Sequence, residues 1–302
     1  MQVRLFTLCL VLLLSRISGA EDLQPAEIFR KVEANYKSMK TYSADGKITS
    51  DLDMGPRKVT LETTFSIKLK KPNMYLISWQ QANSMTPAFV QSGAVWSDGS
   101  QPYLYLGVTK AYSKMSNDEM ALGGATGVSG GSAFTIPSLF LPLATTEPSR
   151  FSQLKDLKRE DDAQVEEEEC YTISGSSPIS KRETWWITKK DYLIKKYSRN
   201  MEPPEGGFKA PELTEEQLED AIKGLGQEVT EERKEAMRKI LKQAEDSLKT
   251  SKLKGEMTEL HSKIACPEFV AADFDFKVPE GTELKKSILG GVLDPTQPEK
   301  KP

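Results

Sequence analysis

The stretch from residue 58 to residue 70 constrains the fold of this chain more than any other. Apolar or β-branched side chains stand at every second position: Val59, Leu61, Thr63, Phe65, Ile67 and Leu69 alternate with Lys58, Thr60, Glu62, Thr64, Ser66, Lys68 and Lys70. Successive side chains of a strand point to opposite faces of its sheet, so the pattern predicts a long strand with one buried face. Because such two-sided strands are typical of antiparallel sheets, we expect a large antiparallel sheet.

Shorter strand patterns lie on both sides of this segment. Lys71-Pro72-Asn73 predicts a turn into a strand over 74–79, and Asp98-Gly99 is the signal of a tight hairpin between strands at 94–96 and 103–106. Further strands are expected at 111–115, 165–174, 185–197 and from residue 256 onward.

Helical spacing predicts a first helix over 25–40. Ile28, Val32, Tyr36 and Met39 recur at intervals of three or four residues, and Pro25 suits a first helical turn. The short apolar segment 136–144, interrupted twice by proline, is expected to form one helical turn that caps the sheet.

The segment 211–253 predicts a highly charged helical hairpin. Thr214 and Gln217 form a capping box at the start of its first helix, and Thr230 can cap the second. The second helix carries a narrow apolar stripe of Met237, Ile240, Leu241, Ala244 and Leu248. Two interpretations stay open for this insertion: a hairpin packed on the sheet, or a mobile lid or partner-binding arm.

The first twenty residues have the pattern of an export signal. Arg4 precedes an apolar run from Leu5 to Leu14, and small residues Ser18 and Ala20 follow. We expect cleavage after Ala20 and export to the periplasm or beyond the cell, without stable membrane insertion, because the run is too short for a spanning helix. Residues 21–290 are then expected to form one domain, and residues 291–302 a disordered tail.

Cys170 and Cys266 are the two cysteines outside this signal. In an oxidising compartment they predict one disulfide, and the alternative is two separate thiols.

The residue content gives no pattern typical of an enzyme, a cofactor site or a metal site. His261 is the one histidine, and no cysteines, histidines and carboxylates cluster at zinc-binding spacing. The glycine-rich segment 123–131 lacks the lysine of a phosphate-binding loop, so we expect a surface loop or cavity flap there. The formal net charge of −3 is spread along the chain and leaves no basic cluster for nucleic acid.

The order of these elements resembles the LolA/LolB-like superfamily, most narrowly its predicted periplasmic proteins of unknown function. The segments that carry the resemblance are KLKKPNMYLISW, WSDGSQPYLYL, TWWITKKDYLIKKY and FDFKVPEGTELKK. The resemblance implies an α+β fold, mainly antiparallel: a half-open β-barrel of about eleven strands covered by helices over an apolar cavity. It also implies a non-enzymatic carrier whose ligand is a lipid or the acyl chain of a lipoprotein.

Large apolar side chains of the central strands are the candidates to line such a cavity, although ordinary core packing is the alternative for each. They are Leu61, Phe65, Ile67, Leu69, Met74, Leu76, Trp96, Trp186 and Ile194. Trp185 and Trp186 are neighbours on a strand and must face opposite ways, so the sequence leaves open which of them faces inward. Two other functions stay open: a structural or signalling module that binds an envelope protein through 211–253, and a glycan-binding protein.

Overall fold

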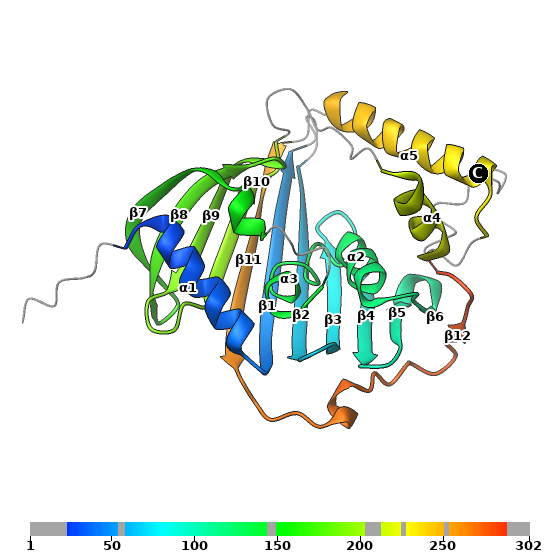
Figure 1. Ribbon diagram of the computed structural model, residues 1–302, viewed down its shortest axis with the longest axis horizontal. Helices are drawn as coiled ribbons and strands as arrows, with labels where there is room; N and C mark the ends of the chain where they lie inside the picture. Colours follow the sequence, from blue (N-terminus) through cyan, green and yellow to red (C-terminus); the bar gives the residue numbers. More distant parts are fainter. Residues whose placement is uncertain are drawn as a thin grey trace, which may run out of the picture.

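The core of the fold is one open twelve-stranded sheet, with the strand order β12-β6-β5-β4-β3-β2-β1-β11-β10-β9-β8-β7 (Figure 1). The computed structural model describes residues 23–53, 58–143, 149–202, 213–224, 228–250 and 254–288. The strands are β1 (Thr41–Asp53), β2 (Lys58–Lys70), β3 (Met74–Asn83), β4 (Gln91–Asp98), β5 (Pro102–Leu106), β6 (Ala111–Lys114), β7 (Lys155–Val165), β8 (Glu168–Ser177), β9 (Ser180–Thr188), β10 (Ile194–Asn200), β11 (Lys254–Ala265) and β12 (Glu283–Leu284).

Every pair of neighbouring strands is antiparallel except β12 and β6, which are parallel. The sheet ends at β7 on one side and at β12 on the other, and it does not close. The predicted α+β fold with a half-open antiparallel sheet is therefore confirmed, with twelve strands in place of about eleven.

The alternating segment forms β2 with the predicted bounds. Phe65, Ile67 and Leu69 are buried on one face, here called the inner face, and each pairs across to a residue of β1 and of β3. The polar residues between them lie on the opposite, outer face. The period-two pattern thus predicted correctly both the bounds of this strand and which of its faces is buried.

Helices α1 (Pro25–Ser38), α2 (Asp118–Val128) and α3 (Pro137–Phe140) cover the inner face (Figure 1). The predicted stripe of α1 is buried through Ile28, Val32 and Tyr36, which join the inner-face strand residues in one apolar core. The helix layer and the sheet therefore bury each other's apolar surfaces.

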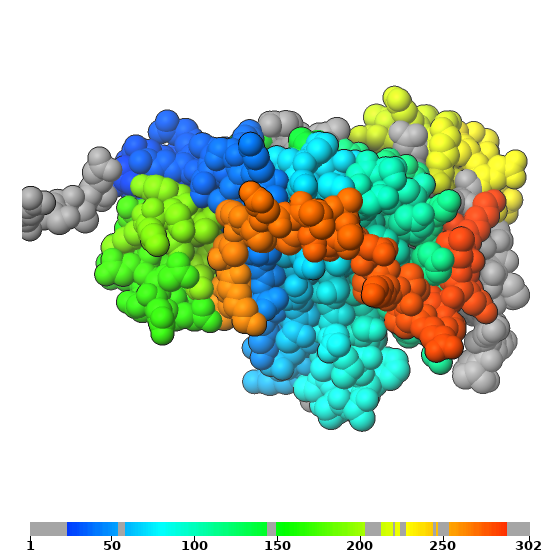
Figure 2. Space-filling view, turned by 90° about the horizontal axis from the view of Figure 1, so that it is seen from below, coloured from blue at the N-terminus to red at the C-terminus, as the bar shows by residue number. Residues whose placement is uncertain are grey.

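The C-terminal segment crosses the outer face, where it is the orange strip of Figure 2. It contains the short 3-10 helix η4 (Ala271–Phe274), and the Lys70 ammonium donates to the carbonyl of Phe269 at 2.6 Å. Phe276 packs on Trp96 with ring centroids 5.0 Å apart. This segment thus shields a second, smaller apolar cluster on the outer face.

The prediction of a loop over residues 123–131 is wrong for residues 123–128, which lie in α2. Asn117 caps this helix by accepting from the backbone N–H of Met120 at 2.8 Å, and Ala121, Leu122 and Ala125 are buried. A good cap and a small apolar face outweigh the helix-breaking tendency of the interspersed glycines.

Helices α4 (Glu215–Gly224) and α5 (Glu231–Thr250) form the predicted hairpin between β10 and β11, which pair directly with each other. Leu218 and Ile222 of α4 are buried, and Lys234 of α5 pairs with Glu215 and Glu219, each at 3.2 Å. The hairpin lies at the β6 end of the molecule in both views (Figures 1 and 2).

The predicted disulfide is wrong, since Cys170 is a free buried thiol and Cys266 a free exposed one. Cys170 lies on β8 and Cys266 follows the end of β11, with β9 and β10 between these strands. Three strand spacings amount to about 14 Å. A disulfide needs Cα atoms within roughly 7 Å of each other, so the fold keeps the two thiols apart.

The predicted signal, residues 1–20, and the predicted tail, residues 291–302, lie outside the described residues. Within the described ranges, no helix is both long and apolar enough to cross a membrane.

Candidate functional site: two adjoining cavities

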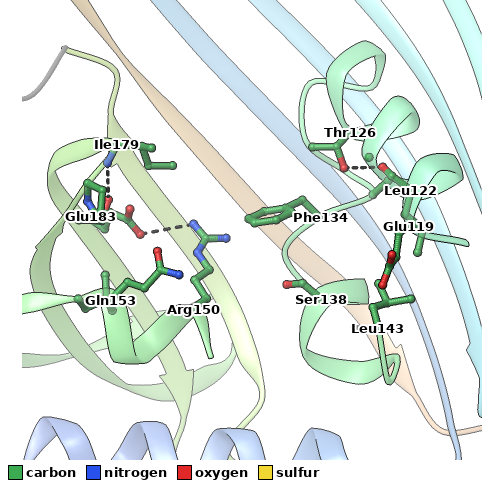
Figure 3. Close-up of a pocket in the computed structure, with 15 residues that line it drawn as sticks. Glu119, Leu122, Thr126, Phe134, Ser138, Leu143, Arg150, Gln153, Ile179 and Glu183 are labelled. Atoms are coloured by element: carbon green, nitrogen blue, oxygen red, sulfur yellow. Dashed lines mark hydrogen bonds and ion pairs between the residues drawn. The ribbon is translucent and has the colours of Figure 1, made fainter. Parts of the chain in front are cut away.

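A cavity of about 360 Å³, here called the apolar cavity, lies between the β9 side of the sheet and the α2–α3 layer. Figure 3 shows Arg150, Gln153, Ile179 and Glu183 on one side of it and Leu122, Thr126, Phe134, Ser138 and Leu143 on the other. Its remaining lining residues are Glu119, Gly123, Ala133, Leu154, Ser177 and Pro178. Most of this surface is hydrocarbon. Of its polar side chains, Arg150, Gln153 and Glu183 lie together on one wall, and Glu119, Thr126 and Ser138 lie on the other (Figure 3).

Local hydrogen bonds hold the two walls in place. At the start of α2, the Asp118 carboxylate accepts from the Tyr75 hydroxyl at 2.9 Å and from the Asn73 amide at 3.2 Å, which fastens the helix to the sheet. On the other wall, Ser149 caps the 3-10 helix η3 (Arg150–Gln153) by accepting from the N–H of Phe151 at 3.2 Å. Each wall is therefore anchored by a capped helix.

Arg150 is the main polar group of the site. Its guanidinium lies over three aromatic rings, 4.9 Å from the centroid of Phe134, 4.7 Å from Trp185 and 4.6 Å from Tyr197. Its Nη2 pairs with the buried carboxylate of Glu183 at 3.4 Å. Rings and carboxylate together fix the orientation of this cation.

Several donors around Arg150 have no acceptor. Among the described residues, Nη1 of Arg150, Nε1 of Trp185 and the hydroxyl of Tyr197 are buried without a hydrogen-bond partner. Burial raises the pKa of Tyr197 above its ordinary value, so that hydroxyl remains a proton donor. A buried unsatisfied donor costs about 1–3 kcal/mol, so a bound acceptor would stabilise this cluster.

A second cavity of about 520 Å³, here called the basic cavity, lies between α1 and α3. It shares Arg150, Ser138 and Leu143 with the apolar cavity, so the two adjoin. Its other lining residues are Glu33, Lys37, Lys71, Leu139, Phe140, Leu141, Pro142 and Ser149.

The structure separates the nine predicted cavity residues into two groups, and none of the nine lines the apolar or the basic cavity. Five belong to the inner-face strand surface: Leu61, Phe65, Ile67, Leu69 and Ile194. The last four of these five are buried in the main core, and Leu61 is half-buried. Their role in ligand binding stays a prediction.

The other four, Met74, Leu76, Trp96 and Trp186, lie on the outer face, so the prediction that they face a common inner cavity is corrected. The start of β3 is apolar at successive positions, and its register with β2 places Tyr75 and Ile77 on the inner face. Met74 and Leu76 then face outward, and Leu76 pairs with Trp96 of β4. A continuous apolar run contains no period that shows which face is buried.

The pair Trp185-Trp186 faces opposite ways, as predicted. Trp185 is fully buried and packs 4.2 Å from the ring of Tyr197, beside Arg150. Trp186 lies on the outer face with the Lys196 ammonium 4.4 Å from its ring centroid. Trp185 therefore packs against Arg150 from within the core, and like Trp186 it lines neither the apolar nor the basic cavity.

The predicted lid residues do not line either cavity. Met237, Ile240 and Leu241 are half-buried on α5, and no described residue of 213–250 lines the apolar or the basic cavity. The side chains of Ala244 and Leu248 lie outside the described ones.

Sequence reasoning missed Arg150, although a signal for it exists. Between Glu119 and Arg150 the sequence contains one charged residue, Glu147. Residues 120–146 are uncharged and rich in apolar side chains, so an arginine so close behind them is a candidate to lie beside apolar surface.

His261 is fully buried on the inner face, away from both cavities. Its Nε2 lies 3.0 Å from Oε1 of the buried Glu259, and Oε2 of Glu259 accepts from the hydroxyl of Thr135 at 2.6 Å. The hydrogen bond between Thr135 and Glu259 joins the segment between α2 and α3 to β11, which is a structural role. Within the described residues, no group of His, Cys, Asp and Glu side chains could hold a metal ion.

No family model matches the chain, and no curated protein matches its sequence. Among solved structures it is similar to an uncharacterized conserved protein from Thermus thermophilus, at 10% identity over 86% of this chain and 97% of that one, with a TM-score of 0.38. It is also similar to lipoprotein LppX of Mycobacterium tuberculosis, at 10% identity over 80% and 96%, with a TM-score of 0.38.

A LolA superfamily protein from Nitrosomonas europaea is a further match, at 7% identity over 84% of this chain and 98% of that one, with a TM-score of 0.28. At these scores the likeness carries no argument about ligand or partner, and the architecture described above defines the fold.

Proposed function

We propose that this protein is an exported, non-enzymatic binding protein that holds the apolar part of a lipid or acyl chain in the apolar cavity. Residues 1–20 would direct export and residues 21–290 would act as one domain. The observation that carries the proposal is the cavity itself: about 360 Å³, walled by Leu122, Phe134 and Leu143, beside an arginine with an unpaired donor. Ligand sites typically combine such apolar walls with a few converging polar groups.

The energetics favour a chain-like ligand. Moving an acyl chain from water to a hydrocarbon surface gains about 0.8 kcal/mol per buried CH₂ group. Such binding needs no catalytic residue. The one histidine of the chain is fully buried in the core, 3.0 Å from Glu259 and outside both cavities.

The test is uptake of a fluorescent fatty-acid probe by a variant with a blocked cavity. Thr126 lines the apolar cavity, and its hydroxyl bonds only to the carbonyl of Leu122 in its own helix, so Thr126→Trp should fill the cavity without breaking a tertiary hydrogen bond. The matched control is Gly127→Trp, which adds a large ring at an exposed neighbouring position that does not line the cavity. We expect uptake to fall in the first variant and to persist in the second.

A docking role for the α4–α5 hairpin is the second candidate function. It is supported by the position of the hairpin at the β6 end of the molecule and by its half-buried residues Met237, Ile240 and Leu241. No described residue of 213–250 lines either cavity. The partner would be an envelope protein.

A further inference from the structure

The basic cavity and the apolar cavity together place positive charge next to hydrocarbon. Lys37, Lys71 and Arg150 line the basic cavity, against Glu33 as the single carboxylate among its described lining residues. Across the shared wall, Leu122, Phe134 and Leu143 give the apolar cavity its hydrocarbon surface. A ligand long enough to occupy both cavities would therefore have one apolar end and one polar end.

Arg150 lies where the two cavities adjoin, and its Nη1 has no hydrogen-bond acceptor in the described structure. A guanidinium carries five N–H groups. In the described structure only Nη2 has a hydrogen-bond acceptor, the carboxylate of Glu183 at 3.4 Å, and the buried Nη1 has none. Because Glu183 offsets the charge of Arg150, the surplus positive charge comes from the lysines of the basic cavity.

Lys71 lines the basic cavity and is held there by backbone carbonyls. Its ammonium donates to the carbonyl of Tyr36 at 2.8 Å and to that of Lys37 at 2.6 Å, at the C-terminal end of α1, and lies 4.7 Å from the ring centroid of Phe140. One of its three donors remains for a ligand. Lys37 is exposed on the last turn of α1 and lines the same cavity.

The one carboxylate of the basic cavity is already engaged. Glu33 accepts a hydrogen bond from the hydroxyl of Ser149, the residue that caps η3. This contact fixes Glu33 on the α1 wall, and its carboxylate keeps its charge. Two lysines against this one carboxylate leave the described lining with a surplus of positive charge.

We propose that the ligand is an anionic amphiphile whose chain lies in the apolar cavity and whose carboxylate or phosphate lies in the basic cavity, bound by Lys37, Lys71 and Arg150. The inference rests on the proposed function, since it assigns the polar end of the same ligand. Arginine and lysine are the side chains that bind carboxylate and phosphate most strongly, through charge-assisted hydrogen bonds. A neutral end would form no charge-assisted hydrogen bond with these side chains, and a cationic end would be repelled by the two lysines.

The test compares three probes that share one pyrene-labelled acyl chain and differ in the polar end: a free carboxylate, a monoacyl phosphate and an uncharged monoacylglycerol. We expect the wild-type protein to bind one or both anionic probes at least about tenfold more tightly than the neutral one. The difference should shrink as salt is added, since ions screen exposed charges. The better of the two anionic probes identifies the headgroup as carboxylate or phosphate.

Charge reversal on α1 gives the matched comparison. Lys37→Glu should weaken binding of the anionic probes by about fivefold or more and leave the neutral probe unchanged. Arg30→Glu makes the same charge change at an exposed position of the same helix outside both cavities, and should leave all three affinities unchanged. Because Lys37 is exposed on the last turn of α1, Lys37→Glu should not impair folding.

The outcomes separate the two proposals. Equal affinity for anionic and neutral probes, or an equal effect of Lys37→Glu and Arg30→Glu, would overturn the anionic assignment while the binding function stands. Binding of none of the three probes would overturn both.

Discussion

At the residue scale, burial determines what each reactive side chain can do. Arg150 is held by three rings and Glu183, so it can bind a ligand without rearranging. His261, by contrast, lies against Glu259 in the core. Sequence reasoning could note that there was one histidine, but not that its ring would be fully enclosed.

The two thiols provide a test at this scale. Burial and the nearby carboxylate of Glu168 raise the pKa of Cys170 to about 11, whereas Cys266 is exposed, although burial of its sulfur also raises its pKa. A raised pKa lowers the thiolate fraction at any given pH below it, and the thiolate is the reactive form. In the chain without residues 1–20, we expect a thiol reagent at about pH 8 to label only Cys266 in the folded protein.

Denaturation should then expose Cys170, so that two thiols per chain react with the reagent in the absence of any reductant. The matched variant Cys266→Ser should show no fast labelling. Finding no free thiol in the denatured, unreduced protein would restore the disulfide and contradict the strand separation between β8 and β11.

At the element scale, the inner face of the sheet requires glycine at a position where an aromatic ring from the neighbouring strand lies against the backbone. Gly93 of β4 pairs with Trp79 of β3, and a Cβ atom at Gly93 would lie 2.2 Å from the Trp79 ring. Gly123 of α2 differs, since no atom lies within 4 Å of the place its Cβ would take.

We therefore expect opposite effects of the same substitution at these two glycines. Gly93→Ala should lower the free energy of unfolding by about 1–3 kcal/mol, because the ring must move in a packed core. Gly123→Ala should raise it by about 0.5–1 kcal/mol through helix propensity and the entropy of the unfolded chain. Urea unfolding measures both, and destabilisation by Gly123→Ala equal to that by Gly93→Ala would contradict the packing described for β3 and β4.

The α4–α5 hairpin can be removed without breaking the sheet. Asn200 of β10 pairs with Glu256 of β11, and the N–H of Met201 donates to the carbonyl of Gly255 at 2.9 Å, so a short Gly-rich turn can replace residues 203–253. Since no described residue of 213–250 lines either cavity, we expect probe uptake and release to be unchanged. Faster release of the probe from the shortened chain would instead support the lid interpretation.

At the scale of the whole molecule, the sequence predicted the sheet better than the site. The strict alternation of 58–70 defined β2, and the helical spacing of 25–40 defined α1, because each reflects one buried face that local periodicity encodes. The cavities depend on contacts between distant segments: Lys37 and Lys71 meet Arg150 only after α1, the β2–β3 turn and η3 are brought together. No local sequence pattern encodes such contacts between distant segments, so sequence reasoning selected inner-face core residues and outer-face strand residues in place of the walls of the apolar and basic cavities.

The most direct test of the central claim is native mass spectrometry of the protein purified from the cell envelope after export. The account predicts a reproducible adduct with the mass of an acyl-chain lipid on the wild-type chain and on Gly127→Trp, and its loss from Thr126→Trp. A wild-type chain that is free of lipid and gains none when mixed with envelope lipid extract, or an adduct that persists undiminished in Thr126→Trp, would contradict it.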